Sequence, residues 1–270
     1  MPIRPLNNKL YVSQIIEARL PSTFAFKRAK KLVRLGKPND GGYLVPESDV
    51  QKADFLFGLG LSDDWSFEKD FRKCNPVTVV CYDPTVGLKA FIGKFISSIF
   101  RVLKPRIPLG HLITLIDYLA FFRGNTRHIQ RLISFYDDEN NTSIETLITG
   151  TDAQNIFFKI DIEGAEYRIL NQLIAHAHRI QGVVMEFHDC DLHLDKIESF
   201  IETFPLKPVH IHANNYAPVS PDANLPLVLE ITFSKHAELD NIEIERHVAD
   251  MPNNPEAPEI LIAYSGNENR

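Results

Sequence analysis

The stretch from Lys159 to Leu170 constrains the fold of this chain more than any other. Its first residues read Lys-Ile-Asp-Ile-Glu-Gly-Ala-Glu. The apolar run Ile156-Phe157-Phe158 before it is typical of a short buried strand, and helix-forming residues follow from Tyr167 to Ala177. A strand therefore stops where a helix begins, and this junction holds three carboxylates: Asp161, Glu163 and Glu166. Open α/β sheets bind ligands at the carboxyl ends of their strands, so the junction predicts an α/β protein with a functional site.

A second strand end carries a glycine turn. Residues 54–61 predict a buried strand that runs into Gly58 and Gly60, where the backbone can approach a nucleotide-type cofactor closely. A β-branched run about twenty residues later ends at Asp83, which a doubly wound sheet places beside that turn to accept hydrogen bonds from ribose hydroxyls. Position 63 is Asp, so the third glycine of a dinucleotide motif is missing and an NAD site is disfavoured.

The segment 38–46, Pro-Asn-Asp-Gly-Gly-Tyr-Leu-Val-Pro, has two interpretations. Asn-Asp-Gly-Gly is strong turn chemistry, and the proline ends a short strand, so the segment predicts a hairpin. Alternatively, it is a loop that carries Asp40 and Tyr43 into a substrate or cofactor site, because loops carry function more often than cores do. The sequence leaves both interpretations open.

The eight-residue string KIDIEGAE closely resembles the K-I-D-x-E-G-A-E signature of FkbM-type methyltransferases, which methylate hydroxyl groups, often on sugars, with S-adenosylmethionine. A segment similar to residues 40–45 occurs in some bacterial FkbM-like proteins. The resemblance implies a Rossmann-like class I methyltransferase sheet, mostly parallel, with seven strands of which the last is antiparallel. It also implies S-adenosylmethionine binding by Gly58, Gly60 and Asp83, with Asp40 and Tyr43 as further candidates.

Histidines mark the later strands of the chain. Residues 182–189, 209–216 and 227–233 predict strands, and alternation places Glu186 and His188 on one face, as it does His210 and His212. Methyl transfer to an alcohol requires removal of the hydroxyl proton, and histidine titrates near neutrality. His188 and His212 are therefore the candidate bases, beside Asp161 as a further catalytic candidate. A buried, hydrogen-bonded histidine is the alternative for each.

Metal assistance is a second route to the same chemistry. Asp161 and Glu186 at neighbouring strand ends are suitable oxygen ligands for Mg²⁺, with His188 as a third ligand less suited to so hard a cation. A bound Mg²⁺ would lower the pKa of the acceptor hydroxyl and orient it.

Between residues 85 and 133 the sequence changes character. Apolar residues keep helical spacing from Leu88 to Leu103, and no acid occurs between Thr85 and Asp117. The basic residues are Lys89, Lys94, Arg101, Lys104 and Arg106. We expect a helical insertion within a single domain of residues 1–270, acting as a lid or as the face of a homo-oligomer. Peripheral membrane contact through residues 88–106 is the alternative.

Amino-acid composition restricts the classes of partner and the cell compartment expected for this chain. With 29 Lys and Arg against 35 Asp and Glu, the net charge of −6 disfavours nucleic-acid binding. Three cysteines without a C-x-x-C pair suggest neither a disulfide framework nor structural zinc. No apolar leader or spanning run is apparent, which predicts a cytoplasmic protein, with any membrane contact peripheral and at the inner face. The C-terminal residues, with three prolines from Pro252 onward, predict an appended edge segment with little chemistry.

These observations predict an S-adenosylmethionine-dependent O-methyltransferase that acts on a sugar hydroxyl, in a surface glycan or a lipid-linked saccharide. The expected partner is a saccharide or glycolipid acceptor. Two alternatives belong to other classes. An NAD-dependent sugar oxidoreductase should carry a Tyr-x-x-x-Lys proton relay, which the sequence lacks. A catalytically silent Rossmann-like binding module would keep the sheet without the cofactor affinity.

Overall fold

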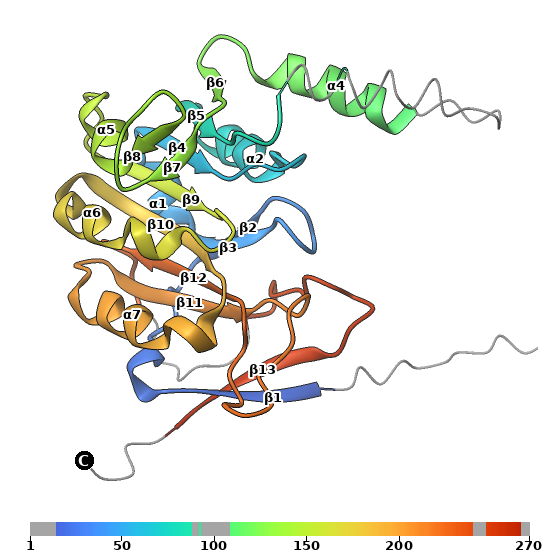
Figure 1. Ribbon diagram of the computed structural model, residues 1–270, viewed down its shortest axis with the longest axis vertical. Coiled ribbons are helices and arrows are strands. Elements are labelled where there is room, and N and C mark those ends of the chain that lie inside the picture. The colour runs from blue at the N-terminus through green and yellow to red at the C-terminus, as the bar shows by residue number, and fades with distance from the viewer. Residues whose placement is uncertain (1–14, 88–91, 93–108, 240–246, 266–270) are drawn as a thin grey trace, which may run out of the picture.

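A seven-stranded sheet runs through the centre of the structure (Figure 1). The computed structural model describes residues 15–87, 92, 109–239 and 247–265. In chain order, the sheet strands of this part are β4 (Phe55–Leu59), β5 (Thr78–Tyr82), β6 (Thr126–Ile129), β9 (Ile156–Ile160), β10 (Ile180–Phe187), β11 (Lys207–Ala213) and β12 (Leu229–Ser234). Neighbouring strands pair in parallel along the series β6-β5-β4-β9-β10. The strand β12 pairs antiparallel with both β10 and β11.

The strand order confirms the predicted fold class. Across the sheet the order is β11-β12-β10-β9-β4-β5-β6. If these seven strands are renumbered 1 to 7 in chain order and read from the β6 edge, the order is 3-2-1-4-5-7-6. This is the doubly wound Rossmann order with one antiparallel strand, the last in the chain, inserted beside the sixth. The order reverses between β4 and β9, which is where such sheets bind their ligands. The KIDIEGAE stretch follows β9, so it lies at this switch point.

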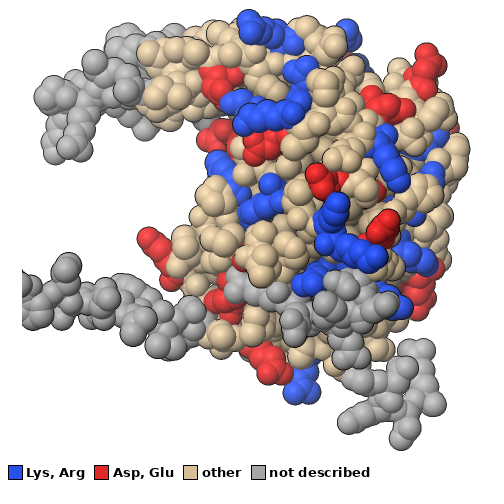
Figure 2. Space-filling model, turned by 180° about the vertical axis from the view of Figure 1, so that it is seen from behind, with Lys and Arg blue, Asp and Glu red and all other residues tan. Residues whose placement is uncertain are grey.

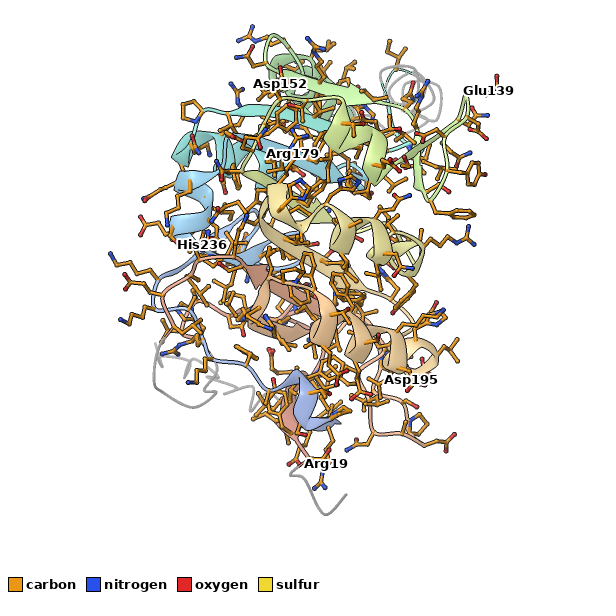
Figure 3. The ribbon with its side chains drawn as sticks, turned by 90° about the vertical axis from the view of Figure 1, so that its left-hand side faces the viewer. Arg19, Glu139, Asp152, Arg179, Asp195 and His236 are labelled. Carbon is orange, nitrogen blue, oxygen red and sulfur yellow. The ribbon has the colours of Figure 1, made fainter. Side chains whose placement is uncertain are left out.

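Helices and apolar side chains cover both faces of the sheet, because its central strands are buried on both sides. On one face, Phe158 and Met185 pack in a core with α5 (Ile144–Thr149), α6 (Leu170–Ala175) and α7 (Cys190–Thr203). Figure 3 looks onto this helical layer. On the other face, Phe157 and Val184 pack with α1 (Glu47–Lys52) and α2 (Ser66–Cys74).

Two smaller strand pairs lie beside the sheet. β2 (Leu32–Leu35) and β3 (Tyr43–Pro46) form the hairpin that segment 38–46 predicts, and Thr232 of β12 donates a hydrogen bond of 2.7 Å to the carbonyl oxygen of Leu44. The other pair joins β1 (Ile15–Leu20) in parallel with β13 (Glu259–Tyr264). The remaining short elements are η1 (Ser22–Phe24), β7 (Leu132–Ser134), β8 (Asn141–Ser143), η2 (Glu166–Arg168) and η3 (Ala177–Arg179).

The helix expected from Tyr167 to Ala177 is divided into η2, α6 and η3. Ile169 precedes α6 and provides no side-chain cap, and the carboxylates of the preceding loop make other contacts. The prediction was therefore right about helical character but wrong about one continuous helix that begins at the acidic cluster.

The expected insertion at 85–133 is shorter than the sequence suggested. Its second apolar segment forms α4 (Leu109–Phe121), as predicted, but residues 126–129 and 132–134 form the strands β6 and β7. The apolar helical spacing of the earlier residues obscured these short strands. Apart from Ile92, the basic segment 88–106 lies outside the described residues. In the described part of the chain, no helix is both long enough and apolar enough to cross a membrane.

The contact between Thr232 and the hairpin predicts a stability effect. Thr232→Val keeps the side-chain volume but removes the buried donor to Leu44, which we expect to cost about 1–2 kcal/mol of unfolding free energy. Chemical denaturation measures this, with Thr203→Val as control, because the hydroxyl of that exposed residue bonds only within α7. Equal midpoints for the two variants would contradict a hairpin held by Thr232.

Candidate active site

The KIDIEGAE stretch folds into a tight loop that the side chain of Glu166 closes. Glu166 Oε1 accepts hydrogen bonds of 3.2 Å from the backbone N–H groups of Ile162 and Gly164. The backbone adopts positive φ angles at Glu163 (53°) and Gly164 (93°), which allows the chain to turn back on itself. Glu166 is fully buried. Its carboxylate therefore fastens the loop from the inside.

Glu166 also orients His188, the residue after β10. His188 Nδ1 lies 3.1 Å from Glu166 Oε1. Since a carboxylate only accepts hydrogen bonds, Nδ1 carries the proton, and Nε2 faces the other acids. Burial lowers the pKa of His188, but the hydrogen bond and charge of Glu166, with the charges of Glu186 and Asp161, outweigh it and raise the pKa to about 9. Tyr167 donates a hydrogen bond to the carbonyl oxygen of His188, which fixes the backbone there.

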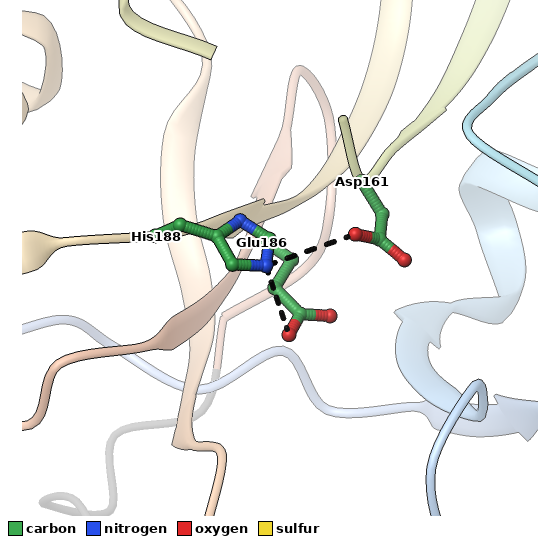
Figure 4. A group of neighbouring side chains, drawn as sticks. All are labelled: Asp161, Glu186 and His188. Atoms are coloured by element: carbon green, nitrogen blue, oxygen red, sulfur yellow. Dashed lines mark ion pairs between the residues drawn. The ribbon is translucent and has the colours of Figure 1, made fainter. Parts of the chain in front are cut away.

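The structure brings together the three residues predicted as metal ligands (Figure 4). One ligand atom each of Asp161, Glu186 and His188 lies within 4.8 Å of the others. His188 Nε2 is 4.0 Å from Asp161 Oδ1 and 3.8 Å from Glu186 Oε1. Two carboxylate oxygens and an imidazole nitrogen suit a divalent cation, and the nitrogen favours a first-row transition metal over Mg²⁺. The donor set therefore fits a metal, and binding stays a prediction.

Hydrogen bonds hold both carboxylates of this cluster. Tyr43 donates to Glu186 Oε2 over 3.1 Å, and Asn214 Nδ2 donates to Glu186 Oε1 over 2.9 Å. Burial, together with the charge of Asp161, raises the pKa of Glu186 to about 8. Lys159 Nζ donates to Asp161 Oδ2 over 3.2 Å and to the carbonyl oxygen of Gly60 over 2.8 Å.

Sequence reasoning assigned no role to Lys159. Its side chain is only 9% exposed, on a strand that is otherwise apolar. Burial lowers the pKa of Lys159, but the charges of Asp161, Glu68 and Glu186 reverse this and raise the pKa above the ordinary lysine value. A lysine inside a buried strand requires a charged partner, and this was the signal available in the sequence. The structure shows that Lys159 connects Asp161 to the glycine turn.

A cavity of about 120 Å³ opens next to Asp161. Asp40 of the β2–β3 connection and Tyr43, the first residue of β3, line one side, and residues 61–64 after the glycine turn line another. Segment 38–46 therefore forms the predicted hairpin, and its residues Asp40 and Tyr43 reach the cavity. Binding of a cofactor by Asp40 and Tyr43 stays a prediction.

Glu68 of α2 also lines this cavity, and the sequence analysis missed it. The residue is 1% exposed, and Oε1 has no hydrogen-bond partner among the described residues. Burial raises the pKa of Glu68 to about 7, against the opposing charge of Lys159. The signal available in the sequence was an acid next to Phe67 in a predicted helix. The structure shows that both residues are buried. An unpartnered carboxyl oxygen at a cavity suits a ligand that carries an ammonium group.

Gly58 and Gly60 have close protein neighbours that the sequence did not predict. A Cβ on Gly60, where φ is +82°, would lie 1.6 Å from the carbonyl oxygen of Asp161, and one on Gly58 would lie 2.5 Å from Glu68 Oε1. Neighbouring protein atoms therefore leave no room for a side chain at either position, so both residues must be glycine.

Asp83 accepts four hydrogen bonds. Oδ2 accepts from the backbone N–H groups of Leu61 and Ser62, and Oδ1 from the N–H and hydroxyl of Thr85, at 2.6–2.8 Å. Burial raises the pKa of Asp83, but these hydrogen bonds outweigh it and lower the pKa. A carboxylate has about four acceptor positions, so in this conformation Asp83 shapes the glycine turn and presents no free position to a ribose. The predicted ribose contact requires these bonds to rearrange.

His212 lies apart from this cluster. It pairs in register with Glu230 of β12, which pairs with Glu186 of β10, so the strand β12 separates the two candidate bases. His212 Nδ1 is 3.2 Å from Asp250 Oδ1, and Nε2 is 3.0 Å from Asn253 Oδ1. Asn253 Nδ2 donates to Glu230 Oε1, which fixes the orientation of the amide. Both nitrogens of His212 therefore face acceptors and both carry protons.

This arrangement corrects two expectations. A buried, doubly protonated imidazole cannot accept a proton, so His212 is not suited to be the general base, and His188 is the remaining candidate. The C-terminal segment does carry polar contacts, because Asp250 and Asn253 supply the partners of His212, and Asp250 Oδ2 is 3.2 Å from His210 Nε2. Its irregular, proline-rich sequence gave no indication of these long-range contacts.

Comparisons with known proteins give distant structural similarities. No protein-family model and no curated protein matches the chain. Among solved structures, it is similar to precorrin-6y C5,15-methyltransferase from Geobacter metallireducens, with 16% identity, a TM-score of 0.38, and coverage of 70% of this chain and 84% of that chain. The 23S rRNA methyltransferase ErmE gives 10% identity, a TM-score of 0.37, and coverage of 72% and 68%.

A third similar structure, Sp1610 of Streptococcus pneumoniae, is a proposed tRNA (m1A22) methyltransferase in complex with S-adenosyl-L-methionine. It shares 9% identity, with a TM-score of 0.34 and coverage of 73% of this chain and 72% of that chain. Similarities this distant carry neither a substrate nor a site residue over to this chain.

The environment of His212 predicts how stability depends on pH. Burial lowers its pKa, but the hydrogen bond to Asp250 and the charges of Glu230, Asp250 and Glu259 raise it to about 9 from 6.5. Because the folded pKa exceeds the unfolded one, this stabilisation is complete below about pH 6.5 and is lost as pH rises through about 9, by roughly 3 kcal/mol.

Thermal and chemical unfolding between these pH values measure the effect. His212→Gln should be less stable than wild type at neutral pH and should lose less stability on the alkaline side. The exposed His178→Gln serves as control and should follow the wild-type profile. Parallel pH profiles for wild type and His212→Gln would contradict a protonated His212.

Proposed function

We propose that this protein is an S-adenosylmethionine-dependent O-methyltransferase with its reaction centre at Asp161, Glu186 and His188. The observation that carries the proposal is the clustering of these residues at the ends of β9 and β10, where Asp161 lines a cavity that residues 61–64 after the glycine turn also line. The resemblance of KIDIEGAE to the FkbM-type signature supports a hydroxyl group of a saccharide, in a glycan or a lipid-linked sugar, as the acceptor.

The cavity suits the amino-acid portion of S-adenosylmethionine. That portion carries an ammonium group, for which the unpartnered Oε1 of Glu68 and the carboxylate of Asp40 are suitable acceptors. Its carboxylate requires a donor, which Lys37 at the cavity edge would supply. The glycine turn around Gly60 would contact the rest of the cofactor.

The acceptor hydroxyl can be activated by a histidine base or by a bound metal cation. The negative charges around His188 favour the metal cation. Without a bound cation, the acids around His188 raise its pKa to about 9, so it is mostly protonated at neutral pH and is disfavoured as a direct base. A divalent cation held by Asp161, Glu186 and His188 would supply a Lewis acid that lowers the pKa of the acceptor hydroxyl and orients it. In this arrangement, Glu166 keeps Nε2 of His188 directed at the cluster, and Lys159 holds Asp161 in position.

Cofactor binding is the first test. Calorimetry should show that the protein binds S-adenosylmethionine and not NAD⁺. Glu68→Gln should weaken that binding by roughly tenfold to a hundredfold, because it removes the charge opposite the ammonium group. The exposed Glu202→Gln is the matched control and should bind as wild type does.

The acceptor class is tested by transfer of a labelled methyl group to saccharides, with RNA as the competing acceptor. Methylated saccharide supports the proposal. Binding of NAD⁺ instead of S-adenosylmethionine would favour an oxidoreductase, and binding of neither would favour a silent binding module.

Metal binding gives a second prediction, with Mn²⁺ alone as the probe. After EDTA treatment, calorimetry and electron paramagnetic resonance should detect one Mn²⁺ site, with Mg²⁺ bound more weakly. Asp161→Asn should abolish it. Glu166→Gln should weaken it by roughly 10–100-fold, because Glu166 fixes the orientation of His188. The exposed Asp191→Asn is the control. Full methyl transfer in the presence of EDTA would exclude the cation from the mechanism.

A further inference from the structure

A second cavity, of about 230 Å³, lies beside β11, the edge strand of the main sheet. The strand β13 lies next to β11 (Figure 1), and residues of both strands line the cavity together with residues 26, 28, 247 and 250. None of the lining residues belongs to the cavity beside Asp161 or to the Asp161 cluster. We call this cavity the β11–β13 cavity, and it is separate from the proposed reaction centre.

His210 brings a ring nitrogen without a partner to the β11–β13 cavity. Its side chain is 7% exposed, and Nε2 lies 3.2 Å from Asp250 Oδ2. Since a carboxylate only accepts hydrogen bonds, Nε2 carries a proton, and Nδ1 is an acceptor in the neutral ring. No hydrogen bond joins Nδ1 to a described residue. Buried polar atoms are normally hydrogen-bonded, and a ligand in the cavity would supply the missing donor.

His247 offers the complementary group. The backbone N–H of Ala249 donates to His247 Nδ1 over 3.1 Å, so Nε2 carries the proton and is a donor. Burial and the charge of Arg28 outweigh the charge of Asp250 and lower the pKa of His247, which keeps the ring neutral at pH 7. Nε2 makes no hydrogen bond to a described residue. The two histidines therefore offer a ligand one acceptor and one donor.

The charges that line the β11–β13 cavity balance. Arg28 and the doubly protonated His212 are cationic, and Asp250 and Glu259 are carboxylates. The same mixture extends over the face of the molecule seen in Figure 2, where Lys and Arg side chains lie among Asp and Glu side chains. A ligand with a full charge would leave one of its own or the cavity's charges uncompensated away from water, which is costly. The lining therefore favours a neutral ligand.

The rest of the lining is largely apolar. Phe26, Ile260, Ile262 and the ring of Tyr264 contribute to it, and the ring of Phe26 packs edge-on against His210 with centroids 6.5 Å apart. Hydroxyl groups both donate and accept hydrogen bonds, and the C–H face of a sugar ring packs against aromatic and aliphatic side chains. The volume is below the roughly 300–1,000 Å³ of pockets for drug-sized ligands, which suits a single sugar ring.

We propose that the β11–β13 cavity binds a neutral monosaccharide unit. Its hydroxyl groups bond to His210 Nδ1 and His247 Nε2, and its C–H face packs on Phe26 and Tyr264. The inference goes beyond the methyl transfer proposed above, because β12 lies between this cavity and Glu186, and it requires neither the cofactor nor a cation.

Nuclear magnetic resonance of the histidine rings in the full chain tests this site directly. The probes are D-glucose, D-galactose, D-mannose and N-acetyl-D-glucosamine at millimolar concentration and constant pH, with D-glucuronate and inorganic phosphate as charged comparators. At least one neutral sugar should shift the ring resonances of His210 and His247 in a saturable manner. The exposed His178, among the ten histidines, should not respond.

Substitutions assign the binding to these side chains. His210→Phe and His247→Phe keep a ring but remove its nitrogens, and each should weaken sugar binding at least tenfold. His247 is only partly buried, so His247→Phe serves even where the buried His210→Phe unfolds. His178→Phe is the matched control and should bind as wild type does.

Four outcomes would overturn the proposal. They are no saturable shift of His210 and His247 with any of the four sugars, a shift confined to His188, unchanged binding by His247→Phe, and a response to phosphate or glucuronate alone. The second outcome would place the sugar at the proposed reaction centre, and the fourth would assign the cavity to an anion. A response at His210 and His247 without methyl transfer would leave this site in place while the proposed function fails.

Discussion

The buried carboxylate of Glu166 is the contact on which the candidate site depends. One oxygen accepts from two backbone N–H groups of the loop after β9 and from the imidazole of His188 after β10. It therefore fixes the loop, the tautomer of His188 and the spacing between two strand ends. A carboxylate without exposure to water requires such partners, because the cost of burying an unpaired charge is large. The same oxygen thus satisfies a folding requirement and positions the side chain that faces Asp161 and Glu186.

Polar contacts extend from this loop across one face of the sheet. Glu186 is held by Tyr43 from the β2–β3 hairpin and by Asn214 after β11. In the next strand, Glu230 accepts from Asn253, which also contacts His212 and Asp40. Segments from near both ends of the chain therefore complete the surroundings of residues in the sheet. Glu186 and Glu230 can be buried on this face because each accepts hydrogen bonds from donors in distant parts of the sequence.

Much of the fold could be predicted, because apolar periodicity is local. Short buried strands alternated with helices, and the last predicted strand proved antiparallel. The cluster of Asp161, Glu186 and His188 was also predicted, since residues at the ends of neighbouring parallel strands lie together in any such sheet. The predictions that failed involved long-range partners. His212 resembled His188 in sequence pattern, yet Asp250 and Asn253 place acceptor oxygens against both of its nitrogens, so both nitrogens carry protons. Long-range neighbours also require Gly58 and Gly60, through Glu68 and the backbone of Asp161, while their contact with a cofactor stays a prediction.

The sequence by itself determined which residues stand at the strand ends, because strand periodicity and the acidic KIDIEGAE junction are properties of consecutive residues. Only the tertiary structure decided what each of those residues does. The protonation of His188 and His212, the use of all acceptor positions of Asp83 and the unpartnered oxygen of Glu68 depend on neighbours brought close by folding. A pKa and a hydrogen-bonding capacity are set by the three-dimensional surroundings of a group, and residue spacing along the chain does not contain them.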